Sequence, residues 1–142
     1  MGLLSRVLRR RPDAAVVLDA ADPALEVCVR APDAARADSA VLADAAAHGV
    51  DLTEPLLVRH HLVGLPPDGV AAARDALAQD GWTVLPGPAG AAPTALLACR
   101  TEVLTALSAS RERSRMAGLA QRLGGDVAGW DALRRPYGSP AG

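Results

Sequence analysis

Residues 56–85 read LLVRHHLVGLPPDGVAAARDALAQDGWTVL, and this stretch decides the fold. Leu56–Val63 is rich in Leu and Val and stops at a glycine and two prolines, which predicts a strand. Residues 67–80 predict a helix, because Ala, Leu and Arg are good helix formers and Gly81 suits the left-handed residue that ends a helix. Trp82–Leu85 predicts the next strand, so the stretch is typical of a β-α-β unit.

The residues that follow continue this pattern. Thr94–Thr101 predicts a third strand, residues 105–123 predict a helix, and a short strand can follow Gly125. The order β-α-β-β-α-β indicates a ferredoxin-like α+β sandwich, with helices on one face of an antiparallel sheet. One stripe of the second helix carries the apolar side chains expected to face the sheet, namely Met116, Leu119, Ala120 and Leu123.

The upstream sequence predicts a further helix over residues 36–48. Two short apolar runs, 15–18 and 25–30, form either a hairpin or an extension of the sheet. The domain organisation that follows is a flexible basic arm over residues 1–13, a single α+β domain over 14–133 and a flexible tail over 134–142.

The composition of the 142-residue chain limits the classes of protein it can represent. Aromatic residues make up 2% and Phe is absent, so the core must consist mostly of Ala, Val and Leu. No run approaches the ~20 apolar residues that cross a bilayer, and the first residues lack the pattern of a secretory signal. We therefore expect a cytoplasmic protein without membrane contact, in which Cys28 and Cys99 are buried free thiols.

Charge is segregated along the chain, although the formal net charge is only -1. Residues 1–11 carry four arginines and no acid, whereas residues 12–58 carry nine acids and two arginines. An acidic segment of this kind either attracts a basic protein surface or forms a solvated face. It disfavours direct binding of nucleic acid.

His60 and His61 are the most conspicuous candidates for chemistry. Consecutive strand residues point to opposite faces, so the two imidazoles cannot share one metal ion or one substrate. We expect one ring to be hydrogen-bonded beneath the helices and the other to lie beside Arg59 on the opposite face. The sequence contains no pattern of metal ligands, no nucleophile motif and no phosphate loop, and we predict a protein that is not an enzyme and has no cofactor.

Trp130 follows Gly129 near the end of the predicted domain, in a chain with few aromatic residues. We expect Trp130 and Asp131 to lie in a closing turn. Tryptophan is a preferred anchor in protein interfaces, and it is equally suited to filling the seam between a sheet and its helices. Both roles stay open at this point.

The closing residues Gly124-Gly-Asp-Val-Ala-Gly-Trp-Asp131 resemble a family signature. The ribonuclease E inhibitor family, regulator of ribonuclease activity B, ends its domain in a helix followed by Gly-Gly-Glu-Tyr-Asp-Gly-Trp-Glu. Asp126 and Asp131 replace the two glutamates of that signature, and Val127 and Ala128 replace its tyrosine and aspartate. The resemblance extends over about residues 38–131 and includes three further segments, Gly49–Leu52, Val58–Leu62 and Leu77–Val84.

This resemblance implies a small, non-catalytic ferredoxin-like protein that binds an RNA-degrading endonuclease of the ribonuclease E type and inhibits or modulates it. The expected partner-binding residues are Trp130, Asp131 and Asp126 in the signature, with the acids Asp44, Asp51 and Glu54 for electrostatic approach. Two other hypotheses are a ferredoxin-like regulatory domain that binds a small molecule and an enzyme that uses His60 or His61.

Overall fold

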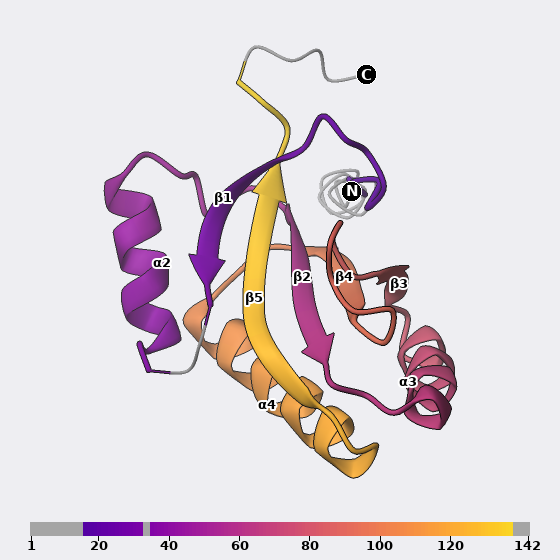
Figure 1. Cartoon of the computed structure of the whole chain (residues 1–142). Coiled ribbons are helices and arrows are strands. Elements are labelled where there is room, and N and C mark those ends of the chain that lie inside the picture. The colour runs from indigo at the N-terminus through magenta and orange to yellow at the C-terminus, as the bar shows by residue number, and fades with distance from the viewer. Residues whose placement is uncertain (1–15, 33–34, 138–142) are drawn as a thin grey trace, which may run out of the picture.

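A five-stranded antiparallel sheet carries three helices in the computed structural model, which describes residues 16–32 and 35–137 (Figure 1). The elements in chain order are β1 (Glu26–Ala31), α2 (Asp38–Ala47), β2 (Leu56–Val63), α3 (Pro67–Gln79), β3 (Thr83–Pro86), β4 (Leu96–Glu102), α4 (Ala106–Arg122) and β5 (Asp126–Arg134). The strands lie in the order β1-β5-β2-β4-β3. The predicted basic arm over residues 1–13 lies outside the described residues.

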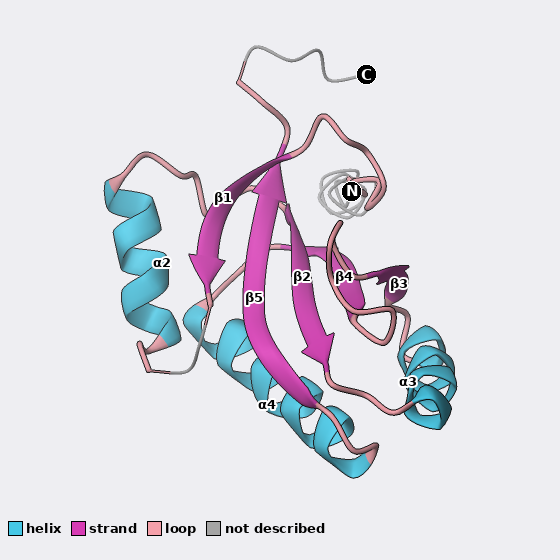
Figure 2. Cartoon of the chain, in the orientation of Figure 1, coloured by secondary structure: helices cyan, strands magenta, loops and turns pink. Residues whose placement is uncertain are grey.

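The segment from β2 to β5 confirms the predicted α+β fold. Its strands β5-β2-β4-β3 pair antiparallel throughout, which is the arrangement of a ferredoxin-like sandwich. The upstream run 25–30 lengthens this sheet, because β1 pairs with β5. All three helices lie on the same face (Figure 2).

Local sequence explains where the helices begin and end. α3 starts at consecutive prolines, whose fixed φ suits the first turn of a helix. α4 starts with a capping box, in which Thr105 and Ser108 each accept a hydrogen bond from the other's backbone N–H. The predicted ranges 36–48, 67–80 and 105–123 are therefore confirmed to within two residues at each end.

The last strand differs from its prediction. β5 has nine residues, and Trp130 and Asp131 lie in this strand rather than in a closing turn. Gly129 has φ +103°, and a Cβ at this position would overlap the carbonyl oxygen of Ala31. The glycine therefore allows β5 to approach the end of β1 closely, and it does not end the strand. Arg134 is still part of β5, so the tail predicted from this residue begins too early.

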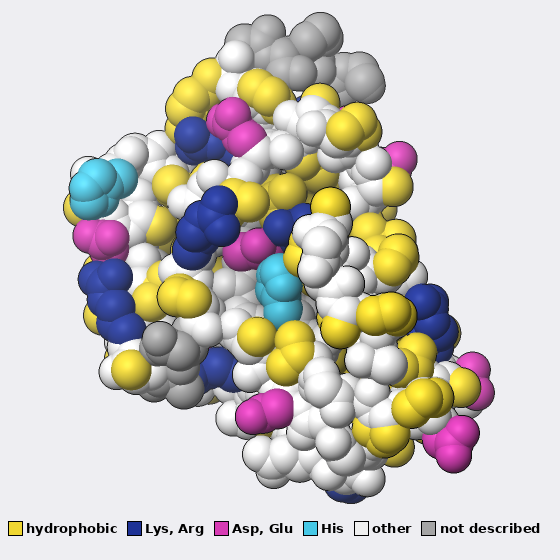
Figure 3. Space-filling view, in the orientation of Figure 1, with side chains coloured by type: hydrophobic (Ala, Val, Ile, Leu, Met, Phe, Trp, Pro, Cys, Tyr) yellow, Lys and Arg dark blue, Asp and Glu magenta, His cyan; other side chains and the backbone are white. Residues whose placement is uncertain are grey.

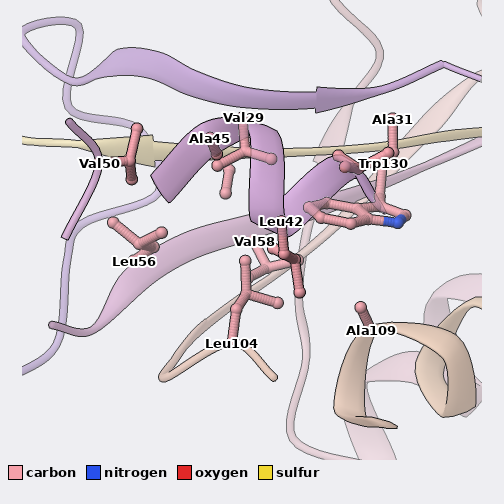
Figure 4. Close-up of a cluster of buried hydrophobic side chains, with 12 residues drawn as sticks. Val29, Ala31, Leu42, Ala45, Val50, Leu56, Val58, Leu104, Ala109 and Trp130 are labelled. Atoms are coloured by element: carbon pink, nitrogen blue, oxygen red, sulfur yellow. The ribbon is translucent and has the colours of Figure 1, made fainter. Parts of the chain in front are cut away.

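Among the described residues, three clusters of buried side chains hold the layers together. Two lie between the sheet and the helices, one around Trp130 (Figure 4) and the other around Met116. The α4 stripe is confirmed, since Met116 and Ala120 are buried and Leu119 and Leu123 pack against the second cluster. The third cluster lies on the opposite face of the sheet, where Leu18 and Leu25 cover side chains of β2, β4 and β5.

Both cysteines are free thiols, as predicted, but they differ in burial. Cys99 is 1% exposed and belongs to the cluster under Leu18. Cys28 is only half-buried, which corrects the prediction that both thiols are buried. It lies at a bulge of β1, where the register with β5 shifts between Val27 and Val29.

Candidate protein-binding surface

Trp130 is a core residue. Its side chain points from β5 toward the helices and is 2% exposed (Figure 4). The indole Nε1 donates a hydrogen bond to Oδ1 of Asp38, at 3.2 Å, and Arg113 pairs with Oδ2 of the same carboxylate at 2.9 Å. Asp38 is itself 4% exposed, so this buried charge needs both partners. Of the two roles left open by the sequence, the structure places Trp130 in the core.

Asp131 points to the opposite face of the sheet and joins β5 to β2. Arg59 donates hydrogen bonds from Nε and Nη2 to its two carboxylate oxygens, at 2.8 and 2.7 Å. His61 Nε2 lies 3.3 Å from Oδ2. Burial alone would raise the pKa of Asp131, but the hydrogen bonds from Arg59 and His61 outweigh it and hold the pKa below its ordinary value. Histidine, acidic and basic side chains adjoin at the centre of this face in Figure 3.

The two histidines lie on opposite faces, as predicted. His61 lies beside Arg59 through their shared partner Asp131. His60 lies beneath the helices and is 1% exposed, but neither of its ring nitrogens has a hydrogen-bond partner among the described residues, which corrects the expected hydrogen bond. Its ring meets Trp82 edge-on at 5.5 Å. Burial, aided by the charges of His61 and Arg100, lowers the pKa of His60 to about 4.

This geometry favours a structural role for the titratable groups near the centre of the sheet. Within residues 16–32 and 35–137, no group of three or more His, Cys, Asp or Glu could hold a metal ion. In the same part of the chain, no helix is long and apolar enough to cross a membrane. Buried polar contacts tie β5 to β2 through Asp131 and to α2 through Trp130.

The family model for regulator of ribonuclease activity B, RraB, matches residues 35–132. The chain belongs to this family. The match runs from just before α2 to within β5, so it includes the ferredoxin-like part and Trp130 with Asp131. Searches of curated proteins and of solved structures gave no match.

The acids expected to meet a partner are exposed in this RraB chain, but they do not form one patch. Asp51 and Glu54 lie together in the turn between α2 and β2 and line one hollow. Asp44 lies on α2 and lines a second hollow, between this helix and β1. Asp126 pairs with Val63 at the far end of β2. Hydrogen bonds from Thr53 lower the pKa of Asp51, which keeps its carboxylate charged.

Sequence reasoning missed the partners of the two signature residues. Asp38 is 92 positions from Trp130, and Arg59 is 72 positions from Asp131. The position of Asp38 at the start of a helix does not indicate a partner, because acids are common in the first turn of any helix for electrostatic reasons alone. Tyr137 was also missed; its hydroxyl donates to the carbonyl oxygen of Gly49 at 3.0 Å and ties the end of the described chain to the α2–β2 turn.

Proposed function

We propose that this chain binds an RNA-degrading endonuclease of the ribonuclease E type and lowers its activity by occupying part of its surface. The observation that carries this proposal is the RraB match over the ferredoxin-like fold. The proposal places the protein in the bacterial cytoplasm, where such an endonuclease acts. It involves no chemistry by the protein itself.

The environment of the histidines supports a non-catalytic mechanism. A general base must accept a proton at an accessible atom within hydrogen-bond reach of the substrate. His60 is buried, and its low pKa reflects the cost of placing a charge in this apolar layer. His61 lies against a carboxylate that two bonds from Arg59 already fix.

The exposed acids give the proposal its contact surface. Asp44, Asp51 and Glu54 lie on α2 and in the turn that follows it, and each is exposed. Carboxylates of this kind attract a basic partner over several ångströms and favour its association. Asp126 is also exposed, but it lies at the far end of β2, so we leave it out of this contact surface.

Trp130 and Asp131 are assigned an indirect part in binding. Both are buried, so they support the surface by fixing β5 against β1, β2 and α2. Their substitution is expected to weaken binding only as far as it loosens the fold. This separates them from the three acids near α2, whose substitution leaves the core intact.

A binding titration with the purified endonuclease tests the proposal. The triple variant Asp44→Ala, Asp51→Ala, Glu54→Ala is expected to bind about tenfold more weakly, and added salt should weaken the wild type more than the variant. RNA must be digested beforehand, because RNA can bridge two proteins. Absence of binding by the wild type at micromolar concentration would contradict the proposal.

A matched control removes three acids elsewhere. Asp68→Ala, Asp75→Ala and Asp80→Ala change the charge equally on α3 and its C-terminal end, where all three acids are exposed. This variant should bind within about twofold of the wild type, because charges far from an interface contribute little. Equal losses in both variants would show that net charge, and not the α2 surface, controls the association.

One observation favours the alternative of small-molecule binding. A hollow of about 210 Å³ beside the α2–β2 turn has an apolar side at Leu18, Val50 and Leu56 and charged groups of both signs around it. A pocket of this kind suits a small ligand with both charges. Stabilisation by a metabolite in a thermal-shift screen, without any binding of the endonuclease, would favour this alternative.

A further inference from the structure

β1 lies at the edge of the sheet. It pairs with β5 along one side, and within the described residues no strand pairs with its other side. An edge strand of this kind directs alternate backbone N–H and C=O groups outward, where another extended chain can bond to them. The bulge at Cys28 leaves Val29–Ala31 as the regular part of this edge.

A hollow of about 240 Å³ lies beside this edge, between β1 and α2. Its apolar lining comes from Val29 on the strand and from Val41 and Ala45 on the helix. Its polar lining comes from Arg36, Asp44 and His48, together with Arg30 of β1. Along α2 in Figure 3, histidine, acidic and basic side chains adjoin one another. A groove bounded by a strand edge and a helix suits an extended peptide.

Arg30 supplies the charge that selects the occupant. It is exposed, and its guanidinium makes no hydrogen bond or ion pair with any described side chain. Its neighbour across the sheet is Asp131, whose carboxylate Arg59 and His61 already occupy. A residue placed opposite Arg30 on an added strand would lie beside a positive charge that no described side chain pairs with, and opposite charges stabilise such cross-strand pairs.

We propose that an extended segment of the endonuclease adds to β1 as a sixth strand, with an acidic side chain opposite Arg30 and small apolar side chains toward Val29, Val41 and Ala45. This inference rests on the proposed function and names its contact. A second copy of this chain fits less well, because the one acid of its β1 is Glu26, which already pairs with Arg134 at 3.4 Å.

Amide hydrogen exchange of the wild-type chain, with and without the purified endonuclease, tests this inference without any substitution. Strand addition should slow exchange at amides of residues 27–31, because backbone hydrogen bonds protect them. Binding with protection confined to other elements would overturn the inference and leave the proposed function standing. Absence of binding would overturn both. Protection of β1 that depends on the concentration of this chain alone would assign the edge to a second copy.

A substitution at Arg30 adds an independent test. Arg30→Glu should weaken binding about fivefold, the size expected for one cross-strand charge pair. The matched control Arg74→Glu changes the same charge at an exposed position of α3 and should bind within about twofold of the wild type. Urea unfolding of both variants checks that each is folded. Equal affinity for Arg30→Glu and wild type would overturn the charge assignment.

Discussion

Replacing Trp130 with alanine tests whether this residue is a structural element or a contact. The side chain is 2% exposed among Val29, Leu42 and Ala109, and its Nε1 satisfies a buried carboxylate of Asp38. Truncating a buried tryptophan costs about 3–5 kcal/mol. Leaving Oδ1 of Asp38 without its donor adds about 1 kcal/mol. We expect a loss of about 4–6 kcal/mol in the free energy of unfolding.

Urea unfolding measures this loss. With a denaturant slope of about 2 kcal/mol/M, typical of a small domain, the midpoint should fall by about 2–3 M. Fluorescence of Trp82 reports the transition in the variant, because this second tryptophan is 4% exposed in the fold. The variant Trp130→Phe keeps most of the ring but removes the N–H, and it should lose about half as much. An unchanged midpoint for Trp130→Ala, together with lost binding of the endonuclease, would refute the core assignment.

Three further predictions concern single residues. Burial lowers the pKa of His60 from its ordinary 6.5 to about 4, so the contribution of this residue to the free energy of unfolding is full above pH 6.5 and falls by about 3 kcal/mol as the pH drops to 4. Urea unfolding of the wild type between these pH values should show this loss. An equal loss of stability in His60→Leu would contradict the prediction. Gly129 has φ +103°, and the Cβ of Gly129→Ala would overlap the carbonyl oxygen of Ala31, so this variant should lose more than about 2 kcal/mol of the free energy of unfolding. An unchanged thermal midpoint would exclude the close approach of β5 to β1. A thiol titration of the folded protein should detect Cys28 alone, because burial raises the pKa of Cys99 to about 11, and two equally reactive thiols would overturn this assignment.

Much of the fold could be predicted because its signals are local. Glycines follow the helices at positions 49, 81 and 124, and each has the positive φ that the sequence pattern implied. The run Leu56–Val63 became a strand with the predicted bounds. The length of β5 could not be predicted in this way. Gly129 interrupts its apolar alternation, and the strand is held by pairing with β1 and β2, which lie far away in the sequence.

The roles of the candidate site residues were predicted less completely, because each role depends on contacts with residues that are distant in the chain. Trp130 was recognised as important, but its burial depends on Asp38 and on the helix that this residue begins. Alternation along a strand correctly separated His60 from His61, yet it could not show that the buried ring has no hydrogen-bond partner in residues 16–32 and 35–137. The groove beside β1 was missed because an edge strand is a property of sheet order, and the short run 25–30 does not reveal its place in the sheet.

The rate at which the endonuclease cleaves a short single-stranded RNA, measured as this protein is titrated in, tests the central claim most directly. If the chain restrains the nuclease by occupying its surface, the rate should fall until the binding sites are saturated and then stay constant. The variant Asp44→Ala, Asp51→Ala, Glu54→Ala should need about tenfold more protein for the same effect. An unchanged rate at concentrations that saturate binding, or cleavage of the RNA by this protein alone, would contradict the account.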